Sequence, residues 1–153
     1  MPTVRLSFTP APVHVRTARL VGVAVARRAG VAEGLLDEVR QAIGEACSRA
    51  VALHLRYGLS DLVMMEMSDT PEYAVRVTDR APVVEAVRTL PDADVLGISP
   101  NGQAADALSE EAVAAGMALA LLTALVDDLQ VRPAAEGAGT EVRMTWPVSR
   151  FVR

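Results

Sequence analysis

The sequence predicts a two-layer α/β sandwich in which helices cover one face of a mixed, mainly antiparallel sheet. Periodicity gives the order strand, helix, helix, strand, strand, loop, helix, strand, which is typical of this architecture. Hydrophobic residues make up 51% of the chain and aromatic residues only 3%. The core is therefore built from small aliphatic side chains, which let helices pack closely on a sheet. A length of 153 residues favours a single domain over residues 1–153.

The first half of the chain contains the clearest periodic patterns. Apolar residues alternate with polar ones over Val4–Phe8, as in a half-buried strand. Helical spacing of apolar residues then predicts a helix over Val13–Arg28, which ends before Gly30. The same spacing predicts the longest helix of the chain over Ala32–Tyr57.

A hairpin and a long loop come next. Leu62–Met67 and Tyr73–Asp79 are β-rich and flank a segment with the composition of a turn, so we expect them to pair. Residues 80–110 are rich in Pro, Gly and Asp and predict a long, exposed and flexible loop of the kind that often has a functional role. A short helix over Val83–Leu90 is compatible with this pattern.

The chain ends with a helix and a strand. An Ala-rich pattern predicts a helix from Ser109 to Leu129, followed by a loop over Pro133–Gly139. Apolar and polar residues alternate again over Val142–Trp146, which predicts the last strand. If all helices cover one face of the sheet, the other face must be polar or covered by a partner.

Composition and charge exclude several classes of function. The net charge is −4 and the arginines are dispersed, which is unlike a nucleic-acid-binding protein. The longest apolar run, Ala112–Val126, is too short to span a bilayer, and the N-terminus lacks the pattern of a secretory signal. Cys47 is the only cysteine and lies in an apolar helical pattern, which favours a buried, inert thiol in a reducing cytoplasm. His14 and His54 lack the spacing of metal ligands or of a catalytic triad, and we interpret both as surface or packing residues.

Four short segments together resemble a set of nucleotide-binding motifs. In chain order they are Glu45-Ala-Cys-Ser-Arg49-Ala50, Asp79-Arg80-Ala81-Pro82-Val83, Gly116-Met117-Ala118-Leu119 and Gly139-Thr140. Over Val4 to Trp146 the chain resembles the anti-sigma-factor serine kinases of bacterial partner-switching systems, in the GHKL (Bergerat) ATPase superfamily. The resemblance implies a histidine-kinase-like ATPase fold, with residues 80–110 in the place of the ATP lid.

The first motif implies a general base and raises a question about the metal. Glu45 matches the family's general base, and Arg49 stands where the family has an asparagine that ligates Mg²⁺. A guanidinium has no oxygen to offer a metal. Arg49 either binds a phosphate directly by paired hydrogen bonds or forms an ion pair with Glu45 one helical turn away. The pairing with Glu45 is favoured, because structural ion pairs are much commoner than new ligand sites.

The second motif implies contact with adenine but has lost both of its glycines. Asp79 matches the aspartate that accepts a hydrogen bond from the adenine amino group, although Asp is also an ordinary residue at the end of a strand. Ala81 and Val83 stand where the family has glycines that let the backbone approach the ring, and Pro82 removes a backbone donor. We therefore expect adenine binding to be impaired.

The remaining motifs are partly retained. Gly116 and Met117 match residues of a helix whose N-terminus lies near the phosphates in the family, where free N–H groups attract anions. Ala118 replaces a second glycine of that motif, a change that a helix tolerates. Thr140, preceded by Gly139, matches the last motif, which also occurs as a plain turn before a strand.

These comparisons predict a regulatory protein of the anti-sigma-factor type that acts by binding partners in the control of transcription. The expected partners are a sigma factor, an anti-anti-sigma protein of the STAS type, or both, and the resemblance also implies a homodimer. No cofactor or metal site is expected; ATP and Mg²⁺ are the cofactors if the family site still works. The alternative is an active ATP-dependent serine kinase that phosphorylates a STAS protein. A third hypothesis is a sensor in which Arg49 holds another anionic ligand.

Overall fold

The computed structural model describes residues 3–82 and 110–149, and the side chains of 110–115 lie outside what it describes. Its elements are β1 Val4–Phe8, α1 Val13–Ala29, the 3-10 turn η1 Glu33–Leu35, α2 Leu36–Arg56, β2 Val63–Ser68, β3 Tyr73–Thr78, α5 Glu110–Leu125, β4 Asp128–Pro133 and β5 Thr140–Trp146. These elements confirm the predicted α/β class.

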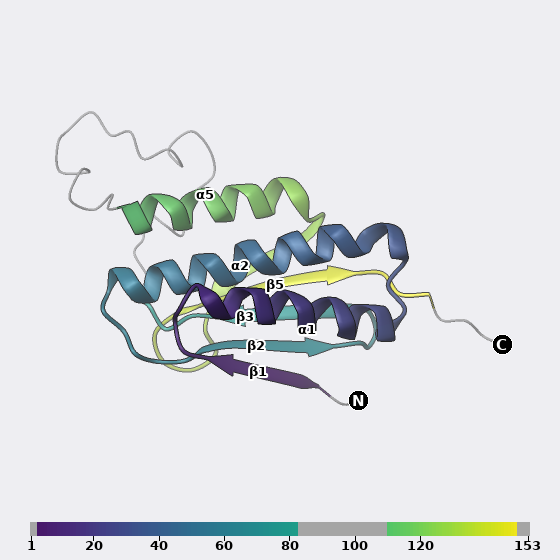
Figure 1. Cartoon of the computed structure of the whole chain (residues 1–153), viewed down its shortest axis with the longest axis horizontal. Helices are drawn as coiled ribbons and strands as arrows, with labels where there is room; N and C mark the ends of the chain where they lie inside the picture. Colours follow the sequence, from purple (N-terminus) through teal and green to yellow (C-terminus); the bar gives the residue numbers. More distant parts are fainter. Residues whose placement is uncertain (1–2, 83–109, 150–153) are drawn as a thin grey trace.

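The described strands form one sheet in the order β1-β2-β3-β5-β4. Every pair of neighbours is antiparallel, so this sheet is antiparallel rather than mixed. The predicted hairpin is the pair β2 and β3. Figure 1 shows the three helices side by side over one face of the sheet, with α2 between α1 and α5. The described elements therefore form two layers.

The end of α5 corrects the sequence prediction. The helix ends at Leu125 rather than Leu129, and Asp128–Pro133 is a strand that the sequence analysis missed. The strand forms because the chain turns back at Val126 and Asp127, which lets β4 pair with β5 along its whole length. The predicted loop is correspondingly reduced to residues 134–139. The predicted helix over Val83–Leu90, and all but the ends of the predicted 80–110 loop, lie outside the described residues.

Helix α1 is fixed by its C-terminus and by close contact with α2. Gly30 adopts a left-handed conformation with φ of 102° and donates its N–H to the carbonyls of Ala26 and Arg27. Gly22 faces Ile43 of α2 so closely that a Cβ there would overlap the isoleucine side chain. The carbonyl of Gly22 also accepts a 2.6 Å hydrogen bond from the buried Tyr73 hydroxyl of β3. These contacts tie the helix layer to the sheet.

The face of the sheet away from the helices is polar in the described strands. Glu66 of β2 lies between Arg5 of β1 and Arg76 of β3 in the register of the sheet. It forms ion pairs with both arginines, at 2.7 Å and 3.5 Å. Arg143 of β5 follows Arg76 in the same row. This face therefore needs no covering layer to bury apolar side chains. Among the described helices, none is both long and apolar enough to cross a membrane.

Candidate functional site

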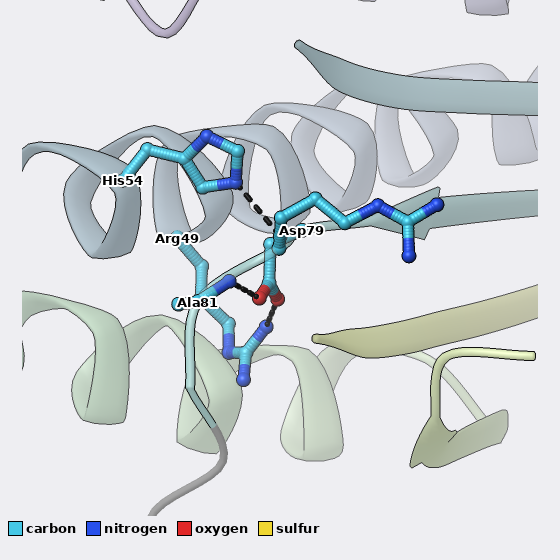
Figure 2. Close-up of polar contacts among 5 residues, drawn as sticks. Arg49, His54, Asp79 and Ala81 are labelled. Carbon is cyan, nitrogen blue, oxygen red and sulfur yellow. Dashed lines mark hydrogen bonds and ion pairs between the residues drawn. The ribbon is translucent and has the colours of Figure 1, made fainter. Parts of the chain in front are cut away.

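Arg49 of α2 and Asp79, just after β3, form the buried centre of the candidate site. Arg49 Nη1 lies 3.1 Å from Asp79 Oδ2, and the two side chains are only 3% and 1% exposed. Figure 2 shows the guanidinium reaching from the helix to the carboxylate at the end of the strand. Because both charges are removed from water, each depends on the other for compensation.

The other oxygen of the Asp79 carboxylate is also in use. Oδ1 accepts a 2.9 Å hydrogen bond from the backbone N–H of Ala81, two residues further along the chain. Ala81 is itself buried. Each oxygen of Asp79 therefore has a donor from within the chain, in the arrangement that Figure 2 shows.

His54 of α2 holds the same segment from a second side. Its Nε2 lies 2.8 Å from the backbone nitrogen of Arg80, and its Nδ1 lies 3.0 Å from the carbonyl oxygen of Asp61. The Arg80 N–H can only donate and the Asp61 carbonyl can only accept, so the ring is neutral with its proton on Nδ1. His54 is fully buried. It is a structural bridge between the α2–β2 loop and the end of β3.

The loop between β4 and β5 closes the site from a third side. The N–H of Asp79 donates to the Thr140 carbonyl at 3.0 Å, and the Arg80 guanidinium donates to the carbonyls of Glu136 and Ala138 at 2.5 Å and 3.3 Å. Gly139 has φ of 121°, and a Cβ on it would overlap the Asp79 carbonyl oxygen. Gly139 is therefore needed for close packing against Asp79.

The structure brings together four of the residues that the sequence singles out: Arg49, Asp79, Ala81 and Thr140. The expected pairing of Arg49 with Glu45 is wrong, because the ion pair of Arg49 is with Asp79. The physical reason is that Asp79 is buried whereas Glu45 is only half-buried, so Asp79 gains far more from a neighbouring cation.

The other predicted site residues take no part in the described hydrogen bonds of this centre. Glu45 lies on α2 one turn before Arg49, and Gly116 and Met117 lie on α5. The described hydrogen bonds join none of the three to Asp79. Val83 of the second motif lies outside the described residues.

The sequence analysis missed the roles of His54 and Arg80. Both depend on contacts between residues 26 to 58 positions apart. A motif such as Asp79-Arg80 carries no local signal for either contact, which arises only when α2, β3 and the β4–β5 loop meet.

The described residues fit a metal-bound nucleotide poorly. Arg49 offers Mg²⁺ no oxygen, and the carboxylate expected to meet adenine is buried in an ion pair with Arg49. The Arg49 Nε is buried and has no hydrogen-bond partner among the residues that the structure describes.

Cys47, near Arg49 on α2, is buried as expected. Burial raises its pKa to about 12, with a small opposing effect of Arg19, so the thiol is chemically inert.

Comparison with known proteins agrees with this fold. The family described as histidine kinase-like ATPase domain matches residues 8–146, and the chain belongs to that family. No curated protein matches the chain.

Proposed function

We propose that this protein is a regulatory domain that binds partner proteins, in the manner of an anti-sigma factor in a partner-switching system, and no longer uses Mg-ATP. The buried ion pair between Arg49 and Asp79 is the observation that supports this most strongly. It joins the position expected to hold the metal to the position expected to meet adenine.

Nucleotide binding in the family manner would require this ion pair to open. Asp79 is only 1% exposed, so adenine could reach its carboxylate only if Arg49 and the Ala81 backbone moved away from it. Separating a buried ion pair leaves a charge uncompensated, at a cost of roughly 3–5 kcal/mol. The N–H of Ala81 would also lose its acceptor. These costs oppose ATP binding, whereas a retained fold is expected if the function lies in partner binding.

Helix α1 supplies a surface suited to a partner. It carries four arginines and no acidic residue, although the whole chain has a net charge of −4. Leu20 is 61% exposed at the middle of the helix, and Arg16, Thr17 and Ala24 are exposed around it. Arginine is enriched at protein interfaces, so the arginines of this helix suit a protein contact surface. Its charge favours an acidic amphipathic helix as the bound element.

The absence of ATP binding is tested by isothermal calorimetry with ATP and Mg²⁺. The wild type is compared with an Arg49→Asn, Ala81→Gly, Val83→Gly variant that restores the family residues. We expect no binding heat from the wild type, whether or not the variant recovers binding. Thermal unfolding of the variant serves as the folding control. Micromolar binding of Mg-ATP by the wild type would contradict the proposal.

The partner is tested by affinity capture from native lysate, with the wild type and an Arg16→Glu, Leu20→Asp variant as matched baits. We expect the wild type to recover a sigma factor, a STAS protein or both, and the variant to lose them. Recovery of neither class would count against the anti-sigma assignment. Equal recovery by both baits would place the contact elsewhere than α1.

The serine kinase remains the alternative outcome of the first test. Glu45 is retained and only half-buried on α2, one turn before Arg49. If the wild type binds Mg-ATP, transfer of labelled phosphate to a STAS protein is the next measurement. Transfer that is abolished by Glu45→Ala would establish the kinase.

A further inference from the structure

One row of side chains on the face of the sheet away from the helices contains three arginines. The row runs through Arg5, Glu66, Arg76, Arg143 and Gln130, each directly opposite the next on the neighbouring strand. Arg76 and Arg143 belong to β3 and β5, which are neighbours within the sheet (Figure 1). Two like charges therefore lie directly opposite each other on this face.

The pairing of β3 with β5 brings these two arginines close together. The N–H of Asp79 donates to the carbonyl of Thr140, its partner in the register that continues the pairing of the two strands. Hydrogen-bonded and non-hydrogen-bonded pairs alternate along an antiparallel ladder, so Arg76 and Arg143 form a non-hydrogen-bonded pair. The Cα atoms of such a pair are about 4.5 Å apart, and the side chains are closer than in a hydrogen-bonded pair. Like charges in this position destabilise a sheet.

Arg143 has no ion pair or side-chain hydrogen bond among the residues that the structure describes. The acceptors on this face are directed at other side chains: Glu66 at Arg5 and Arg76, Glu141 and Gln130 at Arg132, and Asp128 at Thr145. Within the described strands, the arginines of this face also outnumber its acidic residues: Arg5, Arg76, Arg132 and Arg143 against Glu66, Asp128 and Glu141. One positive charge on this face is therefore without a counterpart.

This arrangement does not help the fold. An uncharged residue in place of Arg143 would remove the repulsion from Arg76 and would suit the strand equally well. A residue that breaks a local rule of stability without a gain elsewhere in the fold is expected at a functional site. We therefore look for a ligand that supplies the missing negative charge.

We propose that an acidic segment of a partner protein docks across β3 and β5 on this face, with one carboxylate between Arg76 and Arg143. The forked donors of a guanidinium match the two oxygens of a carboxylate. The ion pair of Arg76 with Glu66 involves the amino group Nη2, so other donors of Arg76 are left for the ligand. The half-buried Met64 and Thr78, in the adjacent row, offer uncharged contacts beside the two arginines.

Charge selects this occupant over other anions. The acidic residues Glu66, Asp128 and Glu141 on the same face would repel the continuous phosphate backbone of a nucleic acid, and the net charge of the chain is −4. A free small anion would gain little, because ion pairs exposed to water contribute little. A protein segment adds contacts around its carboxylate and shields the ion pair from water. The surface lies on the opposite face of the sheet from α1, so this proposal does not depend on the anti-sigma assignment.

Peptide titration followed by the amide signals of β3 and β5 in nuclear magnetic resonance tests the proposal. The probe is a peptide of alternating glutamate and threonine, and its control has glutamine in place of glutamate. At low ionic strength we expect only the glutamate peptide to shift these signals, and added salt to weaken its binding. Arg143→Gln should raise the Kd from these signals about fivefold, as for the loss of one ion pair. Arg16→Gln removes the same charge from α1 and should leave this Kd unchanged.

Several outcomes of this titration would overturn the proposal. They are the absence of shifts in β3 and β5, an unchanged Kd in Arg143→Gln, and tighter binding of an oligothymidylate at the same signals. A wild-type dimer in light scattering that Arg143→Gln converts to a monomer would also overturn it, because a second copy would then be the occupant.

Thermal unfolding tests the unpaired charge independently of any peptide. Arg143→Gln should raise the midpoint by about 1–3 °C in low salt, because the repulsion from Arg76 is removed, and by less in high salt. Arg40→Gln removes an equal charge from an ion pair on α2 and should not raise the midpoint. A lower midpoint in Arg143→Gln would show that this arginine stabilises the fold, and would overturn the inference.

Discussion

Arg49 and Asp79 are 30 positions apart in the chain, yet their side chains meet at 3.1 Å in the interior, where neither has appreciable access to water. A buried ion pair contributes little net stability, because desolvation offsets the attraction between the charges. The pair instead determines which group can lie beside Asp79. Once the Asp79 carboxylate is buried, only a cation from within the chain or an equivalent hydrogen-bond donor can occupy the position next to it. The pair thus links the stability of the domain to the chemistry of its candidate site.

Removal of both partners should therefore cost less than the sum of the two single removals. We expect Arg49→Met and Asp79→Asn each to lower the free energy of unfolding by about 3–5 kcal/mol, because an unpaired buried charge or an unmatched polar group remains. The double variant should be less destabilised than the sum of the two. Urea unfolding of the four proteins gives this coupling energy directly.

An exposed ion pair provides the matched control. Arg40 and Asp37 lie 2.6 Å apart on the surface of α2, and both are largely exposed. Arg40→Met should cost no more than about 1 kcal/mol. If Arg49→Met were equally mild, the buried pair would not have the structural role that we assign to it.

The fold was predictable wherever one face of an element is buried. Alternation over Val4–Phe8 and Val142–Trp146, and helical spacing before Gly30, each reflect a boundary between core and solvent. Strand β4 was missed because Leu122, Leu125 and Leu129 keep a helical spacing beyond the point where α5 ends. As an edge strand with largely exposed residues, β4 has only Leu129 and Val131 to indicate alternation.

The candidate site was predictable as a set of residues but not as a set of contacts. Arg49, Asp79 and Thr140 were identified from motif positions, and the structure brings them together. The partner of Arg49 was predicted wrongly because spacing along a helix makes Glu45 a neighbour, whereas the choice of partner depends on burial. Burial of Asp79 is decided by the packing of β3 between α2 and β5, which no local pattern encodes.

The bridge made by His54 should be visible in both stability and amide exchange. Leucine at this position leaves the Arg80 N–H and the Asp61 carbonyl without their partners, so we expect His54→Leu to cost about 1–3 kcal/mol. The Arg80 amide should lose protection from hydrogen exchange. The proton assignment is checked by the nitrogen chemical shifts of the ring, and a neutral ring with its proton on Nε2 would contradict it.

His14 is the matched control for this substitution. It is half-buried and meets Phe8 edge-on, with ring centroids 6.2 Å apart. His14→Leu should change the unfolding free energy by no more than about 0.5 kcal/mol, as is usual for a surface position.

Gly139 should tolerate substitution far less well than another glycine with positive φ. Alanine there would meet the carbonyl of Asp79 and also adopt an unfavourable φ of 121°, so the β4–β5 loop must move. Gly58 has φ of 64°, and a Cβ on it meets nothing within 4 Å. Gly58→Ala should cost about 1 kcal/mol from backbone strain alone. Gly139→Ala should cost clearly more and weaken the exchange protection of the Asp79 amide. Equal costs would show that the contact with Asp79 is unimportant.

The stability of the protein should fall in alkaline solution, and Cys47 should be a main cause. Burial raises the pKa of the Cys47 thiol from 9.0 to about 12, and burial likewise raises the pKa of Tyr73 above its usual value. In the unfolded chain both groups lose their protons at ordinary values, whereas the folded chain retains them. Their contribution to the free energy of unfolding is therefore fully present below pH 9. It is lost as the pH rises from there to the raised pKa values of the folded protein.

The absence of lysine makes this effect easier to measure, because no lysine side chains titrate in the same range. Between pH 8 and a pH of about 10.5, ionisation of Cys47 in the unfolded chain should remove about 2 kcal/mol. Urea unfolding at the two pH values measures this loss for the wild type and for Cys47→Ala. The fall in the free energy of unfolding between the two pH values should be smaller in Cys47→Ala by that amount, whatever the variant's stability at neutral pH. An unchanged slope with pH would mean that the thiol ionises as readily in the folded protein as in the unfolded chain, contrary to its burial in the core beside Ile43 and Val51.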